Sequence, residues 1–97
     1  MESSNFWHVY IVECSDKKLY VGIAKDLNKR IALHNKGLAC RFTKYRKPVE
    51  LIYKEKYDNK SAARNRELEI KRYGRKKKLE LMGLRSFSAY NAPVGRI

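Results

Sequence analysis

The segment 8–22 constrains the fold most strongly, because its pattern is typical of two short strands joined by a tight turn. The strand segments, 7–12 and 19–23, are rich in β-branched and aromatic side chains, which favour strands. Polar turn-forming residues lie between them. The sequence therefore predicts an antiparallel hairpin that carries one tyrosine in each strand, Tyr10 and Tyr20.

The two tyrosines can serve one site only if they project from the same face of the sheet. Side chains alternate along a strand, and directly paired residues share a face. A two- or four-residue loop would separate the tyrosines, whereas a three-residue loop or a bulge would bring them together. A shared function therefore predicts an odd loop or a bulge, with other side chains facing the opposite way: Val9, Ile11, Leu19 or Val21.

A first helix is predicted over residues 26–37. Asp26 can cap its beginning, and Gly37 stands beyond its end, where a left-handed conformation is common. Arg30 and His34 are one helical turn apart, so they are neighbours at the edge of the apolar stripe. The helix therefore presents a cation and a titratable imidazole side by side.

The segment 37–47 predicts a basic loop in which cations alternate with aromatic rings. Lysine and arginine bind phosphates and aromatic rings stack on bases, so this mixture is common on nucleic-acid-binding surfaces. A solvated basic loop with two packing aromatic residues is the alternative. The candidate nucleic-acid-binding residues are Arg41, Lys44, Tyr45 and Arg46, together with Lys71 further along the chain.

Residues 49–55 alternate apolar and charged side chains, which predicts a third, half-buried strand. Residues 60–73 then predict a second helix, capped by Asp58 or Asn59 and closed by Gly74.

Glu67 lies on the apolar stripe of this second helix, together with Ala63 and Ile70. A carboxylate that faces a core is costly unless it is paired or binds a metal. Three roles are therefore open to Glu67: an ion pair with Arg64 or Lys71, a place at a stripe edge that reaches water, or a metal site.

The length of 97 residues predicts a single domain. We expect residues 6–83 to form this domain, with a short third helix over 75–82. Residues 1–5 are expected to be disordered, and residues 84–97, which show no periodicity, to form a flexible tail.

The net charge of +13, from 23 Lys and Arg against 10 Asp and Glu, indicates a protein that binds polyanions, with nucleic acid as the leading partner. No apolar run approaches the ~20 residues that span a bilayer. We therefore expect a cytoplasmic protein without a membrane partner, in which Cys14 and Cys40 are reduced thiols.

Val9-Tyr10 and Tyr20-Val21-Gly22 resemble the two halves of the GIY-YIG nuclease signature, with His8 in place of the first glycine. Three later features also resemble this family, in particular its small stand-alone bacterial members: Arg30 in the first helix, the helix ending His34-Asn35, and Arg66-Glu67 followed by Ile70-Lys71. The resemblance implies an α+β fold, in which a small three-stranded antiparallel sheet is flanked by helices.

The resemblance also implies metal-dependent hydrolysis of phosphodiester bonds, in DNA more than RNA, with repair or recombination as the setting. Glu67 would hold one divalent ion, Mg²⁺ or Mn²⁺, and Arg30 would contact the scissile phosphate. Tyr10 would orient or deprotonate the attacking water, with Tyr20 assisting. His34 is the rival base, since an ordinary tyrosine with a pKa of about 10 is only ~0.1% phenolate at pH 7.

Two other functions compete with this one. The chain could be a basic module that binds DNA or RNA and does not use its GIY-YIG site, or an interaction protein whose charge maintains solubility. The presence of Tyr10, Tyr20, Arg30 and Glu67 together favours the nuclease. We expect a monomer, with a protein partner as one source of substrate specificity.

Overall fold

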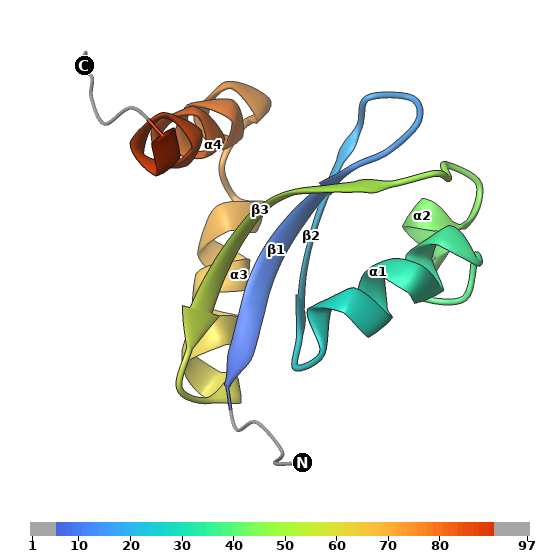
Figure 1. Ribbon diagram of the computed structural model, residues 1–97, viewed down its shortest axis with the longest axis horizontal. Helices are drawn as coiled ribbons and strands as arrows, with labels where there is room; N and C mark the ends of the chain where they lie inside the picture. Colours follow the sequence, from blue (N-terminus) through green and yellow to red (C-terminus); the bar gives the residue numbers. More distant parts are fainter. Residues whose placement is uncertain (1–5, 91–97) are drawn as a thin grey trace.

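A computed structural model describes residues 6–90, with side chains through Gly83. The three strands form one antiparallel sheet in the order β2-β1-β3, and helices flank it (Figure 1). The predicted α+β fold is therefore confirmed. The elements are β1 (Trp7–Glu13), β2 (Leu19–Ala24), α1 (Leu27–Asn35), α2 (Arg41–Lys44), β3 (Glu50–Tyr57), α3 (Lys60–Lys71) and α4 (Arg75–Tyr90).

The sheet has a separate apolar layer on each face. α3 packs on β1 and β2, and α1 with α2 lies on the other side of the sheet (Figure 1). The buried residues of the α3 layer include Val9, Ile11, Val21, Ala63 and Ile70. Those of the α1 layer include Tyr10, Val12, Ala24, Leu27 and Val49. Residues that alternate along β1 thus enter opposite layers, as the period of a strand requires.

The hairpin has the register that a shared tyrosine site requires. Tyr10 pairs with Gly22 and Val12 pairs with Tyr20, so both tyrosines project from the same face. The loop is closed by the Cys14 N–H, which donates to the Lys18 carbonyl at 2.8 Å. Three residues, 15–17, therefore form the turn, with Lys17 left-handed at φ 73°. The predicted odd loop is confirmed.

Local chemistry determines where α1 and α3 begin and where α1 ends. The Asp26 carboxylate accepts from the Lys29 N–H at 3.0 Å at the start of α1, and Gly37 beyond its end has a φ of +77°. Asn59, one of the two predicted caps, accepts from the Ala62 N–H at 2.8 Å at the start of α3. Capping residues therefore position both helices along the chain.

The structure corrects two boundaries. The segment predicted as a basic loop contains the one-turn helix α2, because Thr43 is completely buried and is drawn inward against α1. The last helix was expected to end at Met82 but continues to Tyr90, since Gly83 in a helix interior costs only about 1 kcal/mol and does not stop it. Residues 1–5 and 91–97 of the expected termini lie outside the described residues.

Arg66 fixes α3 against β3 and so positions the neighbouring Glu67. Its guanidinium donates from Nε and Nη2 to the two carboxylate oxygens of Glu55, at 2.9 and 3.0 Å. The hydroxyls of Tyr53 and Tyr57 also donate to Glu55. Burial opposes ionisation of Glu55, but these hydrogen bonds outweigh it and hold the pKa of the carboxyl below its ordinary value.

Candidate active site

Two tyrosines and one histidine meet between the sheet and α1. The Tyr10 hydroxyl and His34 Nε2 are hydrogen-bonded at 2.9 Å. The Tyr20 ring completes the group, with its centroid 6.4 Å from that of Tyr10 and 5.4 Å from that of His34. Tyr10 is 1% exposed and His34 is 0% exposed. The structure thus brings three of the candidate catalytic residues together in a largely dry environment.

Thr43 extends this group on the far side of the imidazole. Its hydroxyl is hydrogen-bonded to His34 Nδ1 at 2.7 Å, and it lies 3.5 Å from the Cys40 sulfur. Sequence analysis missed Thr43, because a threonine nine residues after His34 in a basic segment carries no local signal. Only the return of α2 against α1 brings the two side chains together.

Gly22 leaves the space that the Tyr10 phenol occupies. A Cβ atom at this position would lie 2.6 Å from the Tyr10 hydroxyl oxygen and 3.1 Å from Cε2 of Tyr20. The first distance is shorter than Cβ contacts in proteins allow, and the second is tighter than most of them. The glycine at the end of the signature is therefore needed for the close approach of the two rings over β2.

Gly22→Ala is expected to destabilise the protein by about 1–3 kcal/mol, because overpacking forces buried side chains from their rotamers. It should also displace Tyr10 from His34. Chemical unfolding measures the change in the free energy of unfolding. Gly83→Ala is the matched control, since its Cβ would meet nothing within 4 Å and alanine favours the helix by about 0.5–1 kcal/mol. A Gly22→Ala protein as stable as its parent would contradict the packing argument.

Arg30 and Glu67 act on the two phenols through their charges. Burial, followed by the neighbouring Tyr20, raises the pKa of Tyr10 well above its ordinary value, while Arg30 lowers it and Glu67 raises it. Burial and the Cys40 thiol likewise raise the pKa of Tyr20 to about 12, and the same two charges act on it. Arg30 from α1 and Glu67 from α3 therefore lie close enough to the tyrosines for their charges to shift both pKa values.

The pKa of His34 is shifted in the opposite direction. Burial and the Arg30 guanidinium both disfavour the imidazolium, so they hold the pKa of His34 below its ordinary value. The imidazole is therefore neutral at pH 7 and carries one lone pair that can accept a proton. Because Tyr10 is a weak acid here, the hydrogen-bonded Tyr10–His34 pair is a better candidate base than a free Tyr10 phenolate.

Glu67 is the candidate metal ligand, and one cation already lies beside it. The carboxylate is buried, and its Oε2 is 3.0 Å from the Lys71 ammonium, which is one of the ion pairs considered from the sequence. No three carboxylate, imidazole or thiol side chains cluster within the described part of the chain. The donor set therefore fits an ion such as Mg²⁺, which binds one or two carboxylates, keeps several waters and takes further oxygens from phosphate.

The basic segment around α2 joins the candidate site to the surface. Phe42 stacks on Tyr20 with ring centroids 5.7 Å apart, and the Arg46 guanidinium lies 4.2 Å from the Phe42 ring. Tyr45 is 82% exposed, and the Lys44 ammonium lies over its ring at 5.4 Å. The five predicted nucleic-acid-binding residues therefore divide into three groups. Arg46 packs next to the site, Lys71 is paired with Glu67, and Arg41, Lys44 and Tyr45 are exposed.

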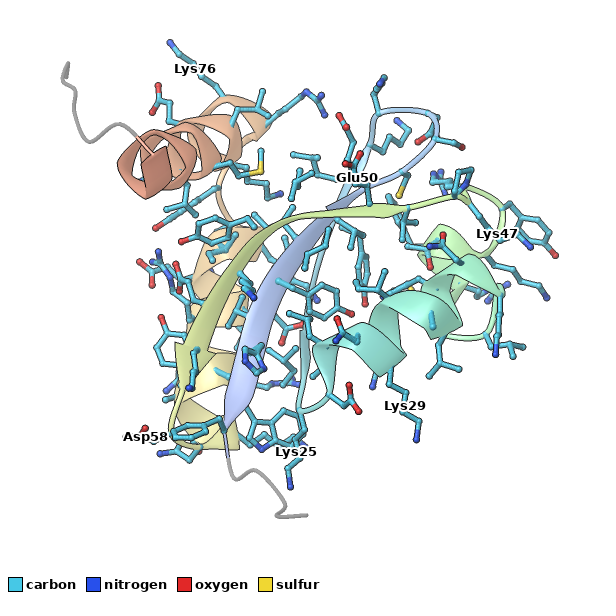
Figure 2. The ribbon with its side chains drawn as sticks, in the orientation of Figure 1. Lys25, Lys29, Lys47, Glu50, Asp58 and Lys76 are labelled. Atoms are coloured by element: carbon cyan, nitrogen blue, oxygen red, sulfur yellow. The ribbon has the colours of Figure 1, made fainter. Side chains whose placement is uncertain are left out.

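Two shallow hollows flank α2, and each is lined by three cations. The first, of about 230 Å³, includes Lys18, Arg75 and Lys78 around Phe42. The second, of about 380 Å³, includes Lys36, Lys44 and Lys47 next to Tyr45. Lysines also project from the surface beside α1 and from α4, among them Lys25, Lys29, Lys47 and Lys76 (Figure 2).

The profile of the GIY-YIG catalytic domain family matches residues 6–80. The chain belongs to the GIY-YIG family. A UPF0213 protein of Staphylococcus aureus (strain Mu3) is 55% identical over 74 residues, which cover 76% of this chain and 90% of the relative. This membership confirms the resemblance seen in the two tyrosine motifs.

Two solved structures share the GIY-YIG fold of this chain. The solution structure of the UPF0213 protein BH0048 from Bacillus halodurans is 34% identical with a TM-score of 0.54, and 81% of this chain and 84% of that one are covered. The solution structure of the protein EF2693 from E. faecalis is 28% identical with a TM-score of 0.60. The match covers 99% of this chain and 100% of that one.

The family indicates interaction with nucleic acid in general.

This GIY-YIG domain departs from the family signature at His8. The His8 side chain lies two residues before Tyr10, on the same face of β1. Its Nδ1 atom is buried and has no hydrogen-bond partner among the described residues. None of the helices within residues 6–90 has the length and apolar character of a membrane-spanning segment.

Proposed function

We propose that this protein is a metal-dependent nuclease that hydrolyses phosphodiester bonds in DNA. One observation carries the proposal: Glu67 reaches the tyrosine–histidine group from α3, because its ion-pair partner Lys71, at 3.0 Å, also lies 5.9 Å from the Tyr20 ring centroid. The charges of Arg30 and Glu67 also bear on the phenols of Tyr10 and Tyr20. A site that combines an acid–base pair, a guanidinium and a carboxylate contains the groups that phosphodiester hydrolysis needs.

In this proposal Glu67 holds one Mg²⁺ or Mn²⁺ ion. When bound, the ion would stabilise the charge that develops on the phosphate and on the leaving 3′ oxygen. Arg30 donates to the scissile phosphate, where a planar guanidinium offers paired N–H groups. Lys71, which pairs with Glu67 in the structure, would then be available to contact the phosphate backbone.

Tyr10 and His34 together supply the general base. Tyr10 accepts a proton from the attacking water while its own proton passes to Nε2 of His34. A concerted transfer avoids a free phenolate, which the raised pKa of Tyr10 disfavours. Tyr20 holds the water and the Tyr10 ring in position, and Phe42 supports Tyr20 by stacking.

The substrate is bound along the cationic hollows on both sides of α2. The exposed Tyr45 provides a ring for base stacking, and the lysines and arginines provide phosphate contacts. We propose that the protein acts as a monomer in the cytoplasm and processes repair or recombination intermediates, and that a partner protein contributes to substrate choice.

A cleavage panel tests the proposed function. Single-stranded, duplex, flap and junction DNA are compared with RNA, each in Mg²⁺, Mn²⁺ or EDTA. Cleavage of at least one DNA that requires the metal is the expected result. Absence of cleavage throughout, with binding that weakens about 10³–10⁵-fold between 50 and 200 mM salt, would instead favour the non-catalytic nucleic-acid-binding module.

A further inference from the structure

A continuous chain of polar groups lies beneath the candidate site. It runs from the Tyr10 hydroxyl to His34 Nε2 at 2.9 Å, then from His34 Nδ1 to the Thr43 hydroxyl at 2.7 Å. It then reaches the Cys40 sulfur, 3.5 Å from the Thr43 oxygen, and the Tyr20 hydroxyl interacts with the same sulfur. His34 and Thr43 are completely buried, so their hydrogen bonds must be satisfied within this chain.

A neutral imidazole carries one N–H, so the chain has two possible directions. In the first, Tyr10 donates to Nε2, Nδ1–H donates to Thr43, and Thr43 donates to the Cys40 sulfur. In the second, every donor and acceptor is reversed. Only the first direction leaves Nε2 with a lone pair toward Tyr10.

Two features favour the first direction. Burial opposes ionisation of the Cys40 thiol, whereas hydrogen bonding from Thr43 favours the thiolate. The pKa of the thiol lies below its ordinary value. The Tyr20 hydroxyl and the backbone N–H groups of Phe42 and Thr43 also favour negative charge on this sulfur. The sulfur is therefore an acceptor for the Thr43 O–H, which leaves the Thr43 oxygen to accept from Nδ1–H. The reversed chain would also leave the buried Tyr10 O–H in need of another acceptor.

We propose that Thr43 is a positioning residue that holds His34 as the Nδ1–H tautomer, with Nε2 ready to accept the proton of Tyr10. The catalytic part of this inference rests on the proposed nuclease function. In the reaction, an O–H bond of water breaks as a new Tyr10 O–H forms. The original Tyr10 O–H breaks as the Nε2–H bond forms, so that hydroxide attacks phosphorus and His34 becomes an imidazolium that still donates to Thr43.

The tautomer of His34 can be measured without any assay of cleavage. Two-bond ¹H–¹⁵N spectra of the parent protein at pH 7.5 distinguish a protonated from an unprotonated ring nitrogen. The chain has two histidines, so a His8→Gln protein completes the assignment. We expect a protonated Nδ1 and an unprotonated Nε2 for His34. The opposite pattern in the parent would overturn the inference even if every Thr43 variant failed to fold.

Variants then test whether Thr43 is the cause. Thr43→Val keeps the shape and removes the hydroxyl, and is expected to give mixed tautomers and a kcat lowered roughly 10- to 100-fold with little change in KM. Thr43→Ser keeps the hydroxyl and should restore both readouts. A folded Thr43→Val protein with a pure Nδ1–H tautomer and full kcat would overturn the inference.

The spectra also separate the two proposals. A parent protein that cleaves no DNA, but whose His34 tautomer depends on the Thr43 hydroxyl, would overturn the nuclease proposal and support the role of Thr43 in orienting His34. A parent that cleaves DNA, with a tautomer unaffected by Thr43→Val, would support the nuclease and overturn the role assigned to Thr43.

Discussion

Replacing Glu67 with glutamine is expected to lower Mg²⁺-dependent cleavage by about 10³-fold or more. The substitution keeps the size of the side chain and removes the charge that would hold the ion. Metal stabilisation of the transition state contributes several kcal/mol, and each ~1.4 kcal/mol changes the rate tenfold. Single-turnover cleavage of the best substrate from the panel measures the effect.

Binding should survive this change. Glu67 is itself negative, so its neutralisation removes a repulsion toward phosphate, and DNA affinity measured in EDTA is expected to stay the same or to rise slightly. Glu69→Gln is the matched control, because Glu69 lies on the same helix with a 55% exposed side chain. A Glu67→Gln enzyme that cuts as fast as its parent would remove Glu67 from the role of metal ligand.

Tyr10→Phe is expected to lower kcat by about 10²–10⁴-fold, the usual contribution of a general acid or base. The phenyl ring fills the same space between β1 and α1, but the oxygen that receives the proton of water is gone. The variant also leaves Nε2 of His34 buried without its partner, which should cost about 1–3 kcal/mol of stability. Cleavage is therefore compared at temperatures well below the unfolding midpoints of both proteins.

Tyr73→Phe is the control for the loss of a tyrosine hydroxyl. The Tyr73 hydroxyl, just past the end of α3, donates to Glu69 and accepts from Arg66, and it is not part of the tyrosine–histidine group. The Tyr73→Phe substitution should leave kcat unchanged. If Tyr10→Phe retained full cleavage while Glu67→Gln did not, the metal would remain in the mechanism and the Tyr10–His34 pair would be excluded as the base.

Features that depend on short-range geometry could be predicted from the sequence. The three-residue turn follows from the requirement that Tyr10 and Tyr20 share a face, and the pairing of Tyr10 with Gly22 satisfies it. The cap at Asp26 and the left-handed Gly37 follow from the side chains themselves. Glu67 was predicted to lie on the buried stripe of its helix, and its side chain is 9% exposed.

Predictions failed or were missing where distant segments meet. α2 was expected to be part of a loop because its four residues have no helical periodicity, yet the burial of Thr43 organises it. Similarly, nothing near residue 82 in the sequence shows that α4 continues to Tyr90. The stacking of Phe42 on Tyr20 also depends on this return of the chain.

The sequence by itself determined the family and indicated the hairpin turn and the candidate catalytic groups, because short local motifs such as Val9-Tyr10, Tyr20-Val21-Gly22 and Arg66-Glu67 carry them. The tertiary structure alone decided how those groups act on one another. Burial makes Tyr10 too weak an acid to serve as a free phenolate, and the contact between α1 and α2 gives His34 its second partner. Desolvation and hydrogen bonding depend on what surrounds a side chain, and those surroundings come from parts of the chain that are distant in sequence.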